Sequence, residues 1–213
     1  SVVRSRPVVV LATPAATIVG SDTGEWSRIV DQRVVPLPQT GAFGAAVVDD
    51  DGVVTVGCWS NSVKQLRAGA HEWTDVQLGA TPVALAATSR GVIAGDATGG
   101  LAFVPVAGKI AIQDLSGSEP IVELCVLSEG LAILGAHGAL DVTGWPFRTT
   151  AASPYRDAHQ LVRVDTSAIG RPYAIYPGPR HGSAIACGRA GYAVLSGSAL
   201  AYIVVEQVAT HVA

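Results

Sequence analysis

Short runs of apolar residues recur along the chain in pairs, and a polar or glycine-containing turn separates the two runs of each pair. The second run of each pair ends in glycine. The five pairs are Val8–Leu11 with Thr17–Gly20, Ala45–Val48 with Val53–Gly57, Val83–Ala86 with Val92–Gly95, Leu124–Leu127 with Leu131–Gly135, and Tyr173–Tyr176 with Ser183–Gly188. Runs of this length are typical of β-strands, whereas an amphipathic helix needs roughly ten or more residues with a period of about 3.6. The pattern therefore predicts antiparallel hairpins.

The glycines that close the second runs recur at a nearly constant interval. Gly20, Gly57, Gly95, Gly135 and Gly188 follow one another after 37, 38, 40 and 53 residues. Apolar runs at 101–104 and 192–195 are candidates for a third strand, and the more polar stretches 34–37, 74–78 and 161–164 are candidates for an outer fourth strand. Four strands in a repeat of about 40 residues are typical of a propeller blade.

The predicted fold is all-β: a single domain over residues 1–213 that forms a β-propeller of about five blade-like four-stranded repeats. The repeats are expected approximately at residues 7–41, 42–81, 82–119, 120–170 and 171–213. A β-sandwich or jelly roll is the alternative, because it too contains many short strands with Gly and Pro turns. In a sandwich, Leu200–Val205 is a late core strand.

Two stretches of the chain carry a resemblance to known repeat families. The segment Val92–Phe103, with the sequence VIAGDATGGLAF, resembles the second and third strands of a tryptophan-aspartate-repeat blade. The segment Ile185–Leu195 is similar to blades of the chromosome-condensation-regulator type. The chain thus resembles the β-propeller repeat superfamily over nearly its whole length. The Trp-Asp and Gly-His dipeptides of such blades are absent, so the resemblance implies a fold and no site residue.

Composition narrows the class of protein. Apolar residues make up 49% of the chain and charged residues 15%, which excludes a disordered chain, and the net charge of −3 argues against a surface that binds anions everywhere. Cys58, Cys125 and Cys187 stand alone among apolar or glycine neighbours, so we expect buried thiols rather than a disulfide framework. The sequence predicts a protein without a membrane-spanning segment, in the cytoplasm or another reducing compartment.

Candidate catalytic and metal-binding patterns are weak. The segment Gly95–Gly100 resembles the active-site turn of chymotrypsin-like proteases, but Thr98 replaces the nucleophilic serine and the turn has one residue more. The adjacent carboxylates of residues 49–51 belong to a tight turn and do not converge on one cation. The histidines show no ligand spacing. We therefore expect a protein that is not an enzyme and that has no cofactor and no metal.

One region favours binding of a partner. The fourth repeat contains about 13 additional residues within 144–160, and inserted loops of repeat proteins often form the binding face. Between residues 148 and 189 six arginines stand against two aspartates, a local charge of +4, with tyrosines among them. Guanidinium groups bind carboxylates or phosphates, so an acidic partner is expected here, and nucleic acid stays open. The predicted partner-binding residues are Trp145, Phe147, Arg148, Tyr155, Arg156, Arg163 and Arg180.

The function predicted from these features is a non-catalytic protein-binding or scaffolding domain, part of a larger chain or complex. The alternative is a structural shell or viral coat subunit with a β-sandwich fold, in which low charge reflects burial against sister subunits and the location is the virion. A hydrolase is a third and weaker candidate.

Overall fold

The computed structural model describes residues 7–106, 110–114, 119–128, 130–144, 161–178, 182–196 and 201–205. They form twenty strands in five four-stranded sheets, numbered here in chain order. Sheet 1 contains β1 (Pro7–Ala12), β2 (Thr17–Ser21), β3 (Trp26–Val30) and β4 (Arg33–Leu37), and sheet 2 contains β5 (Phe43–Val48), β6 (Val54–Cys58), β7 (Ser62–Leu66) and β8 (Thr74–Gln77). Sheet 3 contains β9 (Pro82–Thr88), β10 (Gly91–Asp96), β11 (Gly100–Pro105) and β12 (Ala111–Asp114). Sheet 4 contains β13 (Ile121–Leu127), β14 (Gly130–Gly135), β15 (Leu140–Gly144) and β16 (Val162–Arg163), and sheet 5 contains β17 (Pro172–Pro177), β18 (Ser183–Gly188), β19 (Gly191–Ser196) and β20 (Ala201–Val205).

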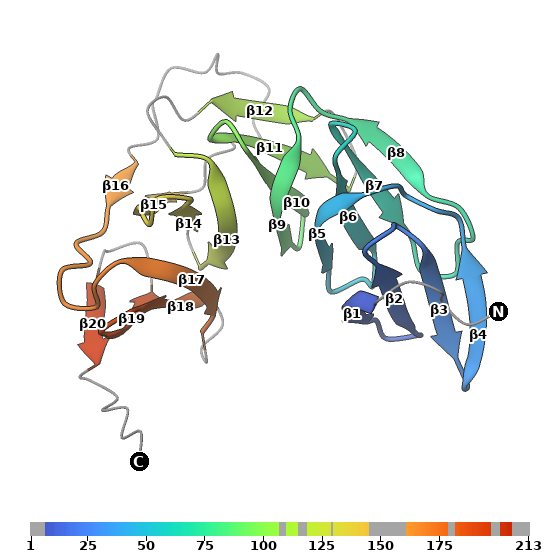
Figure 1. The fold of residues 1–213 in the computed structure, drawn as a ribbon, viewed down its shortest axis with the longest axis horizontal. Coiled ribbons are helices and arrows are strands. Elements are labelled where there is room, and N and C mark those ends of the chain that lie inside the picture. Colours follow the sequence, from blue (N-terminus) through green and yellow to red (C-terminus); the bar gives the residue numbers. More distant parts are fainter. Residues whose placement is uncertain are drawn as a thin grey trace.

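Each sheet is a meander in which consecutive strands pair antiparallel, because two-run hairpins with short turns leave each strand beside the one before it. Figure 1 shows the five sheets side by side along an arc, with β1, β5, β9, β13 and β17 on its concave side and β4, β8, β12, β16 and β20 on its outside. The sheets that pack closely are consecutive in the sequence. The prediction of an all-β, propeller-like fold with four-stranded repeats is confirmed. The two-layer sandwich does not form, and β20 is the outer strand of sheet 5 rather than a core strand.

The register shows that the closing glycines do not all occupy one position. Gly20, Gly57 and Gly95 pair with Val9, Ala45 and Ala84. Gly135 and Gly188 instead pair with the first residues of their neighbouring strands, Ile121 and Pro172. In sheets 1 and 3 the residues that pair with the first residue of the neighbouring strand are Ser21 and Asp96. The residues that correspond to Gly57 in sheets 4 and 5 are therefore Leu134 and Cys187, so the spacing that we read from the sequence contains a one-residue offset.

Gly57 and Gly95 let the next sheet approach closely. A Cβ at Gly57 would lie 3.1 Å from the carbonyl oxygen of Pro82, and one at Gly95 would lie 2.6 Å from Cγ2 of Ile121. Pro82 and Ile121 begin the first strands of the following sheets. At these two junctions a side chain on the second strand would therefore crowd the first strand of the following sheet, and glycine avoids this.

We call the face of each sheet that is turned toward the next sheet its front, and the opposite face its back. The front of sheet 3, with Ile93, Leu101 and Phe103, forms one apolar cluster with Ile121, Leu131 and Ile133 on the back of sheet 4. A similar cluster joins the front of sheet 4 to the back of sheet 5. All residues of β6 and β14, and all of β10 except Asp96, are buried. The second strands of the internal sheets are thus covered on both faces, which explains their almost uninterrupted apolar sequences.

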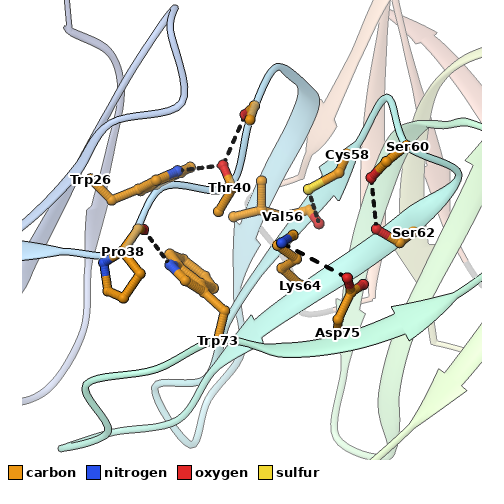
Figure 2. Close-up of polar contacts among 11 residues, drawn as sticks. Trp26, Pro38, Thr40, Val56, Cys58, Ser60, Ser62, Lys64, Trp73 and Asp75 are labelled. Carbon is orange, nitrogen blue, oxygen red and sulfur yellow. Dashed lines mark hydrogen bonds and ion pairs between the residues drawn. The ribbon is translucent and has the colours of Figure 1, made fainter.

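The junction of sheets 1 and 2 adds polar contacts to this packing (Figure 2). The Trp26 ring is fully buried and lies 5.1 Å from the Phe43 ring and 5.4 Å from the Trp73 ring, measured between centroids. Its indole Nε1–H donates to Oγ1 of Thr40 at 2.8 Å, and the Thr40 hydroxyl donates to the carbonyl of Gly41 at 3.0 Å. The Trp73 indole donates to the carbonyl of Pro38. Both indole N–H groups are therefore satisfied while their rings are packed.

The Trp26–Thr40 hydrogen bond generates a stability prediction. Thr40→Val keeps the side-chain shape but leaves the buried indole N–H without an acceptor, so we expect the free energy of unfolding to fall by about 1–3 kcal/mol. In a Trp26→Phe background the same change should cost clearly less, because no indole N–H remains. Thr74→Val on the exposed strand β8 is the matched control, with an expected effect below about 0.5 kcal/mol. Urea denaturation of the four variants checks this, and equal costs of Thr40→Val in both backgrounds would contradict it.

Candidate functional site

The predicted partner-binding residues fall mainly outside the part of the chain that the structure describes. Trp145, Phe147, Arg148, Tyr155, Arg156 and Arg180 lie outside the described residues, as does most of the inserted segment that joins β15 to β16. Arg163 is described. Its Nε and Nη2 donate to the two carboxylate oxygens of buried Asp141 at 2.5 and 3.3 Å, and these hydrogen bonds raise the pKa of the guanidinium. Arg163 thus joins the short strand β16 to β15.

The two sequence patterns that resemble a catalytic turn and a cation site, residues 95–100 and 49–51, contain carboxylates that form hydrogen bonds within their own turns. The Asp96 carboxylate accepts hydrogen bonds from the Thr98 hydroxyl at 2.6 Å and from the backbone N–H of Thr98 and Gly100. Asp49 accepts from the backbone N–H of Val53 across its own hairpin. Among the described residues, no group of three or more His, Cys, Asp or Glu side chains is placed to hold a metal ion.

Every first strand contains a β-bulge at the same place. In each of the five sheets the register skips one residue directly after the first residue of the strand. The skipped residues are Val8, Gly44, Val83, Val122 and Tyr173. Each bulge lies near the start of a first strand, beside the turn that leads from the second to the third strand of the same sheet. Figure 1 shows that these first strands line the concave side of the arc. Bulges redirect side chains and are frequent beside functional sites.

The bulges expose apolar side chains. Val8, Val122 and Tyr173 are 54%, 42% and 65% exposed, although they belong to the strands that line the concave side. In sheet 2 the bulge residue is Gly44, which has no side chain. The Trp59 ring lies beside it, because Nε1 of Trp59 is 3.7 Å from the position that a Cβ of Gly44 would take. Trp59 is 63% exposed. We call this set, with the half-buried Val83, the bulge rim. Its members are Val8, Trp59, Val83, Val122 and Tyr173.

A hollow of about 340 Å³ opens on the bulge rim between sheets 4 and 5. Val122 and Tyr173 line it on the apolar side, and Arg171 and Arg189 add two exposed guanidinium groups. Within the described part of the chain, neither arginine forms an ion pair with a carboxylate. The hollow therefore combines apolar surface with two exposed arginines that have no ion-pair partner among the described residues.

Backbone contacts hold the walls of this hollow in place. The stem of Arg171 crosses the turn between β14 and β15, where a Cβ at Gly138 would lie 2.6 Å from Cγ of the arginine, and φ of Gly138 is +87°. The Arg171 guanidinium donates to the carbonyl of Ala136 at 3.2 Å. The turn that contains Arg189 is anchored by the N–H of Ala190, which donates to the carbonyl of Ile169.

Two glutamates stabilise the same region. Glu123 of β13 accepts a hydrogen bond from the backbone N–H of Ile175 in β17 at 2.5 Å, which connects sheet 4 directly to sheet 5. Glu119 accepts from the backbone N–H of His137 at 2.7 Å. Both carboxylates thus accept hydrogen bonds from backbone N–H groups, and the bond from Ile175 to Glu123 helps to fix sheet 5 on sheet 4.

A larger groove of about 840 Å³ lies at the opposite ends of the first strands, lined by residues of sheets 2 to 5. By residue type, its candidate nucleophiles are the Cys125 thiol and the hydroxyl groups of Thr88, Ser89, Ser128 and Ser183. Burial, with a contribution from Glu123, raises the pKa of the Cys125 thiol to about 11, so the thiolate that a nucleophile needs is scarce at neutral pH. The groove therefore lacks an activated thiol.

Reasoning from the sequence missed the bulge rim. It placed Tyr173, Arg171 and Arg189 in the basic segment but did not select them as binding residues. A weak signal was available, because Pro7, Pro82 and Pro172 begin three first strands directly before the bulged residue. Proline lacks an N–H for the ladder and is favoured at strand starts and bulges.

Comparisons with known proteins support the fold. No family model matches the chain. No curated protein matches it either. It is similar to human WBSCR16, with a TM-score of 0.65 and 14% identity over 90% of this chain and 62% of that one. It is also similar to BBS1N, a β-propeller solved in complex with ARL6DN, with a TM-score of 0.63 and 14% identity over 93% of this chain and 66% of that one.

A third similar structure is the computationally designed Ika4 protein, with a TM-score of 0.57 and 16% identity over 67% of this chain and 92% of that one. The chain thus spans less than two thirds of the length of WBSCR16 and BBS1N. Identities this low establish a shared fold and not a function. Within the described residues, no helix has the length and hydropathy needed to cross a bilayer.

The environments of the three cysteines predict selective alkylation. Cys58 and Cys125 are buried and burial raises the pKa of both thiols, whereas Cys187 is half-exposed. At about pH 8 we expect iodoacetamide to modify Cys187 at least about tenfold faster than the other two, because thiolate and access are both required. Peptide mass spectrometry after timed quenching measures the three rates. A Cys125 rate equal to that of Cys187 would show that the thiol is not shielded.

Proposed function

We propose that the chain is a non-catalytic protein-binding domain and that an acidic segment of its partner docks on the bulge rim between sheets 4 and 5. The observation that carries the proposal is the combination, within one hollow, of two exposed apolar bulge residues, Val122 and Tyr173, with Arg171 and Arg189. Exposed aromatic and arginine side chains are the residue types that contribute most to protein interfaces.

The apolar part of the surface supports a protein partner. Five first strands carry the bulge, and most of the bulged positions leave a large apolar side chain in solvent, which costs free energy unless something covers it. A β-propeller of similar fold, BBS1N, has been solved in complex with a protein, ARL6DN. That neighbour makes a binding role for this fold reasonable, and the site itself is argued from this chain alone.

The charged part of the surface supports an acidic partner. A planar guanidinium binds a carboxylate through two parallel hydrogen bonds, so two arginines beside one hollow suit a segment with two or more Asp or Glu residues around an apolar side chain. The rest of the chain is net negative, since the molecule carries −3 while residues 148–189 carry +4. An acidic segment is therefore guided to this region and repelled elsewhere.

A peptide array tests the proposal. The probes are ten-residue peptides that carry one Phe or Leu between Asp or Glu residues, together with the same peptides in which Asn and Gln replace the acids. We expect the acidic peptides to bind, and we expect Arg171→Gln with Arg189→Gln to weaken binding about tenfold or more, since hydrogen bonds to charged groups contribute about 1.5–3 kcal/mol each. Tyr173→Ala should weaken binding as well. Affinity should fall as salt rises from about 0.05 to 0.3 M.

The matched control is Arg33→Gln with Val35→Ser on the outer strand β4, where an arginine and a valine are also exposed. This double variant should bind the acidic peptides like the unchanged protein. Equal binding of acidic and neutral peptides, or unchanged binding by the Arg171 and Arg189 double variant, would refute the proposed site.

A further inference from the structure

A third opening lies between sheets 1 and 2, at the end of these sheets away from the bulge rim. It has a volume of about 230 Å³, and its lining includes Ile18, Val54 and Leu66, each no more than 2% exposed. The charged residues that line it are Arg28 of β3 and Arg67, which follows β7. This opening, which we call the inter-sheet hollow, therefore combines apolar surface with two arginines.

Arg28 occupies a position that the other sheets give to a side chain without charge. In sheet 1 the register pairs Ile18 with Arg28, on the face turned toward sheet 2. Phe103, at the equivalent position of sheet 3, is 5% exposed in the cluster between sheets 3 and 4. A charged group in such a place costs free energy unless it has a partner, so the arginine indicates a site for an anion. The equivalent pairs in sheets 2 to 5 are Thr55 with Gln65, Ile93 with Phe103, Ala132 with Val142, and Ile185 with Val194.

Hydrogen bonds connect the two arginines through one turn. Nη2 of Arg28 donates to the carbonyl of Ala70, and the backbone N–H of Ala70 donates to the carbonyl of Arg67 at 3.0 Å. The positive φ of Gly69, +76°, is typical of the third residue of such a turn. The bond to Ala70 uses one of the five N–H donors of the Arg28 guanidinium, so donors remain for a ligand.

No carboxylate of the described residues forms an ion pair with either arginine. Asp31 and Asp51 adjoin the lining residues Val30 and Gly52 in the sequence, and both aspartates are exposed. Arg28, in contrast, is half-buried. The inter-sheet hollow thus offers positive charge to an anion that enters it.

The size and walls of the inter-sheet hollow select a small ligand. Its volume of 230 Å³ corresponds to roughly eight water molecules of liquid, which is room for an apolar body of about six to ten carbon atoms. A planar carboxylate fits a guanidinium through two parallel hydrogen bonds. The lining strands β2, β3, β6 and β7 are each paired on both edges, so an extended peptide finds no strand edge to join. The geometry therefore favours a free acid over the end of a peptide.

We propose that the inter-sheet hollow binds a small free monocarboxylic acid with an apolar body of about six to ten carbon atoms. The carboxylate pairs with Arg28 and Arg67, and the apolar body lies against Ile18, Val54 and Leu66. This inference goes beyond the proposed binding function, because it concerns another junction of the molecule and a small molecule rather than a protein segment.

A titration of the whole chain, followed by NMR, tests the inference. The probe is 3-phenylpropanoate, and the control ligand is 3-phenylpropanamide, which has the same apolar body without the charge. We expect saturable shifts of the backbone amide signals of Gly52 and Gly69, which line the hollow. The acid should bind at least about tenfold more tightly than the amide, because hydrogen bonds between charged groups are stronger than neutral ones. Equal affinities for the acid and the amide would overturn the inference.

Substitutions locate the ligand. Arg67 is exposed, so Arg67→Gln should leave the fold unchanged, and it should weaken binding of 3-phenylpropanoate about fivefold or more. Ala16→Leu should prevent binding, because the larger side chain fills the hollow. The matched control is Arg90→Gln, since Arg90 is also exposed, on the turn between β9 and β10. Unchanged binding by Arg67→Gln would overturn the inference, whether or not Ala16→Leu folds.

Two further results identify another site or another occupant, and each of them overturns the inference. One is a set of shifts that saturate at Arg171 and Arg189 but not at Gly52 and Gly69, because the acid then occupies the bulge rim. The other is a ten-residue peptide ending in Phe that binds the inter-sheet hollow at least about tenfold more tightly than 3-phenylpropanoate, because a peptide end is then the ligand. The double variant Arg171→Gln with Arg189→Gln should bind the acid unchanged, which separates this inference from the proposed function.

Discussion

Burial of a sheet on both faces by its neighbours is the interaction on which this structure depends. A four-stranded meander of about 35 residues cannot form a core of its own, since a single layer leaves both faces in water. The internal sheets bury both of their faces by stacking on one another. Ile93 on sheet 3 and Ile121 on sheet 4, for example, belong to one apolar cluster that is buried between the two sheets. Each such side chain contributes about 1.5–3 kcal/mol when fully buried. Gly57 and Gly95 allow the following sheet to approach closely at two of the junctions, whereas Leu134 occupies the equivalent position in sheet 4.

The same constraint explains where the surface is apolar. Stacking buries the faces of the sheets but not the outer faces of the first and last sheet, nor the residues at bulges. Exposed apolar residues such as Val10 and Val122 lie at these two kinds of place. Val10 and Tyr176 belong to the first case, because they lie on sheets at the ends of the arc. Val122 and Tyr173 belong to the second, because a bulge places one residue outside the pairing register.

The bulge rim is positively charged at the junction of sheets 4 and 5. The protein as a whole is slightly acidic, yet the junction of sheets 4 and 5 carries Arg171 and Arg189 on turns fixed by backbone hydrogen bonds. Among the described residues, neither arginine forms an ion pair with the nearby carboxylates of Glu119 and Glu123, which accept hydrogen bonds from backbone N–H groups. A guanidinium held on a rigid turn loses less entropy on binding than one on a mobile loop. The junction thus presents preorganised positive charge beside apolar surface.

The sequence by itself determined the strands, their antiparallel pairing and the repeat of four strands, because apolar runs and turn residues act over a few positions and recur with a period. It also indicated the basic segment that contains Arg171, Arg189 and Tyr173. The tertiary structure decided the rest. The one-residue offset of Gly135 and Gly188, the bulges at Val122 and Tyr173, and the meeting of two arginines at one hollow all depend on register and on contacts between sheets. Such contacts join residues tens of positions apart, and the only local sign that we find is the proline directly before three of the five bulged residues.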